Sequence, residues 1–166
     1  MMIRRGSGGY YVNGIIARWP RSGVSLRDAE TFARGGSATV PDLATSDLQI
    51  RNDLFTEIGG NPVFQAGGGS TVQNSLDLAG NNLTNSTATT ASLFTALPAT
   101  GTVPSGLSAF DWTPVAGSPA ATGGMATFTG KIATKAGTVV AGTSYVGAAA
   151  PGGAKWWAGW TTYARN

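Results

Sequence analysis

Four acidic side chains in the first third of the chain have the type and spacing that could suit a metal ion. They are Asp28, Glu30, Asp42 and Asp47. Calcium takes roughly six to eight oxygen ligands, some of them backbone carbonyls, so a loop that carries several carboxylates is a candidate calcium site. Arg27 and Arg34 stand among these acids, and a solvated loop with local charge pairs is the alternative that we favour.

Aromatic side chains offer a second kind of chemistry, the binding of sugars. Tyrosine and tryptophan combine a large apolar ring with a polar group, so rings that face solvent can stack on carbohydrate. The candidate carbohydrate-binding residues are Tyr10, Tyr11, Trp19 and Trp112. Packing of these rings in a core or a cap is the alternative, and an aromatic row on one exposed face would decide against it.

Catalysis has little support in the sequence. The chain lacks cysteine and histidine, which excludes thiol chemistry, zinc–thiolate sites and acid–base catalysis by imidazole. Glycoside hydrolysis needs two carboxylates about 5 to 9.5 Å apart, and no acidic pair has a diagnostic spacing. Pectate-lyase-like elimination, with Arg27 as the basic residue, has no motif either. We therefore expect a non-enzymatic protein without a cofactor.

The composition indicates an extracellular or envelope protein rich in β-structure. Only 11% of the 166 residues are charged, against roughly 25% in average globular proteins. The chain also contains 25 glycines. The net charge of +3 comes from few, scattered basic residues, so we expect no nucleic-acid binding.

Targeting and membrane segments are not evident. Residues 1–5 lead into a glycine-rich stretch and not into the apolar segment of a signal peptide. No apolar run approaches the roughly 20 residues of a membrane span. An extracellular composition without a signal peptide predicts a piece of a longer protein.

The elements that must position these residues are predicted from a repeat. Residues 9–19 and 49–58 share an order of apolar, polar and asparagine positions, with Asn13 matching Asn52 at an offset of 52 − 13 = 39. Offsets of this size are typical of stacked structural repeats. We predict two parallel strands in register, one above the other, with the two asparagine amides bonded as a ladder.

The remainder of the chain divides at a glycine-rich break, residues 67–70. Residues 1–66 are predicted to form terminal coils of stacked strands. Residues 67–166 are predicted to form a degenerate last layer, loops and an aromatic C-terminal cap, and both parts are predicted to belong to one structural domain. Trp156, Trp157 and Trp160 would close the last layer, whose unpaired edge otherwise invites aggregation.

Several motifs carry a family resemblance. They are residues 4–13, 22–29, 111–120, 145–148 and 157–161. In this order they resemble the late coils and closing segment of secreted bacterial right-handed parallel β-helix proteins, which are pectate-lyase-like in architecture and mostly of uncharacterised function. The resemblance implies an all-β fold: the last coils of a right-handed parallel β-helix followed by an irregular C-terminal cap.

The resemblance also implies a location and partners. Members are secreted or lie on the cell surface, and they have many coils before this point. A C-terminal piece would leave its N-terminal layer uncapped, so we expect self-association through that end. The function expected first is a structural role in the bacterial envelope or extracellular space. The alternative is a carbohydrate-binding or polysaccharide-active module.

Overall fold

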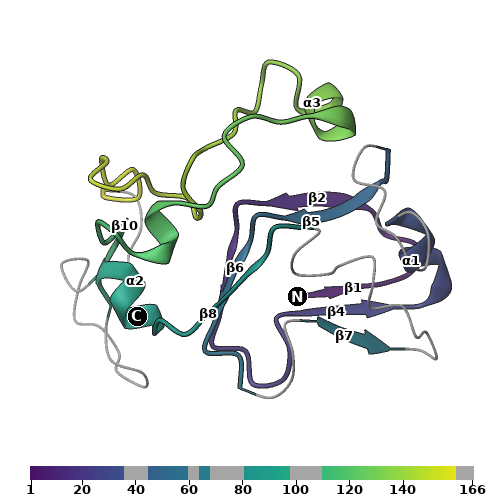
Figure 1. The fold of residues 1–166 in the computed structure, drawn as a ribbon, viewed down its shortest axis with the longest axis horizontal. Coiled ribbons are helices and arrows are strands. Elements are labelled where there is room, and N and C mark those ends of the chain that lie inside the picture. The colour runs from purple at the N-terminus through teal and green to yellow at the C-terminus, as the bar shows by residue number, and fades with distance from the viewer. Residues whose placement is uncertain (36–44, 60–63, 68–80, 98–109, 160–166) are drawn as a thin grey trace.

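The computed structural model describes residues 1–35, 45–59, 64–67, 81–97 and 110–159. Short strands stack as parallel layers in the first half, and a C-terminal arm, defined here as residues 122–159, lies beside them (Figure 1). The elements are β1 (Met2–Ile3), β2 (Gly9–Val12), β3 (Ile15–Ala17), β4 (Val24–Arg27), α1 (Ala29–Arg34), β5 (Leu48–Arg51), β6 (Leu54–Thr56), β7 (Phe64–Gly67), β8 (Thr84–Ser86), α2 (Thr90–Leu93), β9 (Phe94–Ala96), β10 (Asp111–Pro114), the 3-10 helix η3 (Pro119–Ala121) and α3 (Gly130–Ala136).

The two similar segments form parallel strands in register, as predicted. β2 pairs with β5 with Tyr11 opposite Ile50, and β3 pairs with β6 with Ile15 opposite Leu54. A third layer follows because β8 pairs in parallel with β6. The repeat in the sequence is therefore a repeat of structure.

An asparagine turns the chain in each of these three layers. Asn13, Asn52 and Asn82 have φ values of 58°, 54° and 53°. This left-handed region is costly for most side chains, but asparagine tolerates it better than other non-glycine residues. Each asparagine therefore forms the corner that leads into the next strand, β3, β6 or β8.

Both faces of the inner strands are buried. Successive residues of a strand point to opposite sides. Ile16 and Phe55 accordingly pack in one apolar cluster with Val24, whereas Ile15 and Leu54 pack in a second cluster. Phe55 and Leu54 are 0% and 1% exposed, which explains the consecutive apolar residues in both repeats.

The predicted fold class, an all-β protein ending a right-handed parallel β-helix, is wrong. The described strands form four small sheets of two or three strands, with three α-helices and no solenoid, so the fold is mixed α and β. Layering stops after β8, where Thr89 caps α2 by accepting a hydrogen bond from Ser92 N. β9 then pairs with β10 in the antiparallel sense. An inserted helix and a reversed strand thus replace further layers.

The corner asparagines hold the C-terminal arm. Asn13 Nδ2 donates to Thr143 Oγ1 at 3.1 Å, and Met125 N donates to Asn13 Oδ1 at 2.6 Å. Asn52 Nδ2 donates to Gly123 O at 2.8 Å. The predicted amide ladder is therefore wrong, since each side chain bonds to the arm instead of to the other. The division at residues 66 and 67 stays a prediction, although β7 extends across it.

Candidate binding cleft

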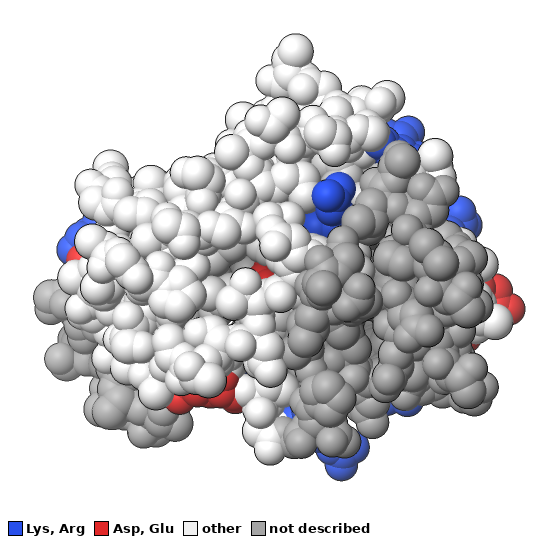
Figure 2. All heavy atoms as spheres, in the orientation of Figure 1, with Lys and Arg blue, Asp and Glu red and all other residues white. Residues whose placement is uncertain are grey.

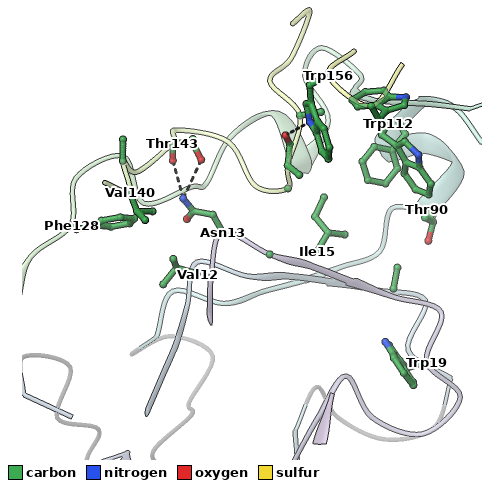
Figure 3. A pocket seen from close by; sticks show the side chains of 18 residues that line it. Val12, Asn13, Ile15, Trp19, Thr90, Trp112, Phe128, Val140, Thr143 and Trp156 are labelled. Carbon is green, nitrogen blue, oxygen red and sulfur yellow. Dashed lines mark hydrogen bonds between the residues drawn. The ribbon is translucent and has the colours of Figure 1, made fainter. Parts of the chain in front are cut away.

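A cleft of about 890 Å³ lies between β3 and the C-terminal arm (Figure 3). This volume is near the upper end of the roughly 300–1,000 Å³ typical of ligand sites. None of the described lining residues is charged. The lining residues are Val12, Asn13, Gly14, Ile15, Ala17, Trp19, Thr90, Phe94, Trp112, Phe128, Val140, Ala141, Thr143, Gly147, Ala148, Ala149, Trp156 and Trp157.

Tryptophans from three distant segments meet around the cleft. Trp19 follows β3, Trp112 lies in β10 and Trp156 lies near the end of the arm. Trp19 and Trp156 are 50% and 53% exposed, so part of each ring faces solvent. In Figure 3 Trp112 and Trp156 lie above β3, on the side to which Ile15 points, and Trp19 lies below the strand. The cleft thus offers several flat apolar surfaces to one ligand.

Ring packing fixes two of these tryptophans. The Trp112 ring stacks on Phe110 with centroids 5.6 Å apart and meets Phe94 edge-on at 5.5 Å. Trp156 Nε1 donates to Ala148 O at 2.8 Å, and its ring lies edge-on to Trp157. Contacts of this kind restrict rotamers, so these rings form a preformed surface.

Contacts between layers hold the main chain at the third tryptophan. The backbone turns at Arg18, whose φ is 59°, and Gly59 N donates to Trp19 O at 2.8 Å. Arg18 Nε and Glu57 Oε2 are 3.1 Å apart. Glu57 Oε2 also accepts a hydrogen bond from Thr90 N at 2.7 Å, which joins α2 to the corner that presents Trp19.

A buried acid lies directly behind the cleft. Asp53 is 2% exposed, and its Oδ1 accepts a hydrogen bond from the N–H of Gly14, a lining residue, at 2.5 Å. Burial raises the pKa of Asp53 to about 7, and the Gly14 bond opposes the shift. A Cβ at position 14 would lie 2.9 Å from Asp53 Oδ1, so glycine permits this close approach.

No charged side chain is among the described residues that line the cleft, and several of the charged side chains elsewhere form ion pairs. Asp47 binds Lys131 at 2.5 Å, which lowers the pKa of Asp47. Asp111 Oδ2 is 2.8 Å from Lys155 Nζ. In the face shown in Figure 2, blue and red atoms lie mainly at the margins of a broad uncharged area of described residues. The cleft therefore has no charge of its own with which to select a ligand.

Two of the four predicted carbohydrate-binding residues line the cleft. Trp19 and Trp112 come together there, whereas Tyr10 and Tyr11 are not among its lining residues. Tyr11 packs against the apolar cluster that contains Ile50. Tyr10 is half-buried, and its hydroxyl has no hydrogen-bond partner within the part of the chain that the structure describes.

The predicted calcium ligands have other partners in the structure. Asp28 caps α1 by accepting from Thr31 N at 2.9 Å, and it accepts from Arg5 N at 2.6 Å. The Arg5 bond is the main reason that the pKa of Asp28 is lowered to about 2. Glu30 is exposed in the first turn of α1.

Two further facts bear on the metal hypothesis. Among the described residues, no group of three or more acidic side chains is arranged to hold a metal ion. Asp42 lies outside the described residues, so the four-residue calcium site stays a prediction.

Sequence reasoning assigned Trp156 and Trp157 to a cap over the last layer. The structure places them beside β3, the first layer, where Phe128 and Val140 also line the cleft. The density of tryptophan near residue 156 was the available signal. It predicted that these rings would pack together, but not which strand they would face.

None of the helices in the described part of the chain has the length and apolarity needed to cross a bilayer. Comparisons of the chain with protein-family models, with curated proteins and with solved structures find no match. The resemblance to secreted β-helix proteins therefore stays a prediction from the motifs.

Proposed function

We propose that the chain is a non-enzymatic, extracellular or cell-surface module that binds neutral carbohydrate in the cleft beside β3. The observation that carries this proposal is the meeting of Trp19, Trp112 and Trp156 around one uncharged cleft. Sugar rings have apolar faces and polar rims. Flat indole rings, with an apolar body and one N–H donor, complement such ligands.

The absence of charged side chains among the described lining residues favours a neutral glycan as the ligand. An acidic polysaccharide would be recognised through arginine, lysine or a bound cation, and none of the described lining residues is basic or acidic. A neutral glycan needs no such partner. Acid–base hydrolysis is not favoured, because Asp53, the acid behind the cleft, is buried and bonded to Gly14 N.

The decisive variant is Trp19→Ala. Half of this ring is exposed, so its loss should affect folding little while removing a stacking surface. We expect wild-type protein to bind at least one member of a panel of cellohexaose, laminarihexaose and mannohexaose in isothermal titration calorimetry. Trp19→Ala should weaken that binding about tenfold or more, which corresponds to ~1.4 kcal/mol.

Val139→Ala is the matched control because Val139 is 90% exposed and does not line the cleft. It should bind as the wild type does. Equal binding by wild type and Trp19→Ala, or no binding to any neutral glycan, would overturn the proposal. Stronger binding to oligogalacturonate than to the neutral panel would contradict the argument from charge.

A structural envelope role is the second candidate. It is favoured by the positions of β1, β2 and β3, each of which is the edge strand of its sheet among the described residues. Edge strands readily pair with other chains. Ordered self-assembly together with failure to bind every glycan of the panel would favour this role over carbohydrate binding.

A further inference from the structure

The hydrogen bonds of β3 show which way its main-chain groups point. Leu54 N donates to Gly14 O at 2.9 Å, and Arg18 N donates to Thr56 O at 3.2 Å. In a parallel pair, alternate residues of a strand bond to the neighbouring strand. The even-numbered residues of this segment therefore face β6, and the N–H and C=O groups of Ile15 and Ala17 point to the opposite side.

The C-terminal arm lies on that opposite side. Gly147 N donates to Asn13 O at 2.6 Å. The arm therefore bonds to the first of the outward-pointing main-chain groups, the carbonyl of Asn13. Gly147, Ile15 and Ala17 all line the cleft. Among the described residues, no hydrogen bond joins the arm to Ile15 or Ala17. The arm thus pairs with one end of the β3 edge and leaves the next two outward residues unpaired beside the cleft.

We propose that the outward main-chain groups of Ile15 and Ala17 are the polar half of the carbohydrate site. This inference rests on the proposed function. A sugar hydroxyl both donates and accepts, as serine and threonine hydroxyls do, so it can bond to a strand edge that presents N–H and C=O groups in turn. The tryptophan rings stack on the faces of the sugar rings, and the main-chain groups at the edge of β3 orient the ligand.

This assignment resolves a deficiency of the cleft. Its side chains are mostly apolar, and Asn13 is already engaged with Met125 and Thr143. Among the described residues, the Thr90 hydroxyl at the cleft has no hydrogen-bond partner, but it is buried. Specific sites combine apolar walls with a few placed polar groups. The edge of β3 supplies such groups without any polar side chain, which is why sequence motifs do not indicate them.

Amide hydrogen exchange measured by NMR tests the proposal directly. The probe is whichever of cellohexaose, laminarihexaose and mannohexaose binds in calorimetry. At saturation, the Ala17 and Ile15 amides should exchange at least tenfold more slowly than in the free protein. Tyr10 is the control. Gly9 N and Asn13 N bond to the β5 side, so the Tyr10 amide points outward on β2, but Tyr10 does not line the cleft.

A backbone variant separates this inference from the proposed function. Replacement of Ala17 by lactic acid exchanges its N–H for an ester oxygen and leaves the side chain unchanged. It should weaken glycan binding about tenfold, while the same exchange at Tyr10, which does not line the cleft, should leave binding unchanged. Unchanged thermal unfolding of the ester variant would confirm that the β3–β6 ladder is intact.

The outcomes are distinguishable. Wild-type affinity in the ester variant, with binding lost in Trp19→Ala, would overturn the edge assignment and leave carbohydrate binding standing. If the ester variant does not fold, amide exchange in the wild-type protein tests the edge assignment instead. The Ala17 amide could instead exchange more slowly as the protein concentration rises, or with an extended peptide but with no glycan. Either result would show that the edge of β3 pairs with another β-strand and would overturn the inference.

Discussion

Asp53 is the residue whose chemistry is most altered by the fold. It stands between Asn52 and Leu54 at the place where the second layer turns, and its side chain is buried behind the cleft. Burial favours the neutral form of a carboxyl group, and the bond from Gly14 N offsets only part of this effect. The protein therefore holds a proton near neutral pH that the unfolded chain has released.

Asp53 should make the folded state less stable as the pH rises. Its pKa is about 7 when folded, against an ordinary value of 3.8. Below pH 4 both states hold the proton, and between these values only the folded state does. The free energy of unfolding should thus fall by roughly 4 kcal/mol as the pH rises from about 4 through 7. Urea unfolding at a series of pH values measures this slope.

Asp53→Asn should flatten the slope and make the variant more stable than wild type at pH 8. Asp47→Asn is the control because its partner Lys131 lowers the pKa of Asp47, and it should leave the slope in that window in place. Two results would show that Asp53 is not the group responsible. One is a free energy of unfolding of the wild type that is constant or rises between pH 4 and 7. The other is a fall of this free energy that persists in Asp53→Asn.

At the scale of elements, the stacked strands depend on a close contact between layers. A Cβ at Gly23 would lie 2.6 Å from Cδ1 of Phe55 and 3.1 Å from Cγ2 of Ile16. Phe55 is fully buried, so its ring has nowhere to move. Glycine at position 23 lets the chain pass close to this ring on its way to β4.

Gly23→Ala should therefore destabilise the protein by about 1–3 kcal/mol through overpacking. Phe55→Leu removes the clash and should by itself cost about 1–3 kcal/mol in lost contacts. The double variant should lose less stability than the sum of the two, with a coupling of roughly 0.5–3 kcal/mol. Ile132→Val on α3, outside this cluster, should combine additively with Gly23→Ala, and additivity for both pairs would disprove the clash.

The register of these layers was predictable, and the way in which they end was not. The match of Asn13 with Asn52 lies in two local patterns of apolar and polar residues, and local patterns determine strand register. The end of the layering depends on the Thr89 cap of α2 and on the pairing of β9 with β10. A four-residue helix leaves little periodic signal, so the sequence predicted an irregular cap without indicating the helix and the reversed strand that follow β8.

At the scale of the whole molecule, three edge strands face outward. β1, β2 and β3 each pair on one side only among the described residues, and Met2 in β1 is 58% exposed. Unprotected edges of this kind pair with other chains unless a charge or a covering segment prevents it.

We expect the average mass of the wild-type protein to rise with concentration in light scattering. Met2→Lys should reduce the association, since lysine on an edge strand opposes strand pairing. Val139→Lys adds the same charge at an exposed site outside the described strands, and it should have little effect. A constant monomer mass at high concentration, or equal effects of the two lysines, would exclude assembly through this edge.

The cleft was predictable only in part, because it forms from the whole chain. Trp19 and Trp112 were identified from residue type, but Trp156 was assigned elsewhere and Phe128 was not considered. No local pattern reports that the arm bonds to the Asn13 corner. The Ile15 and Ala17 edge carries no motif at all, because its polar groups belong to the backbone.

The bonds that fasten the arm to the corner also set the order in which the molecule matures. Asn13 meets partners that lie 112 and 130 positions further along the chain. At a synthesis rate of about 5–20 residues per second, Thr143 leaves the ribosome roughly 7 to 26 seconds after Asn13, and Gly147, which donates to Asn13 O, follows it. Neighbouring layers can associate well before then. A nascent chain therefore acquires its stacked strands early and completes the cleft between β3 and the arm last.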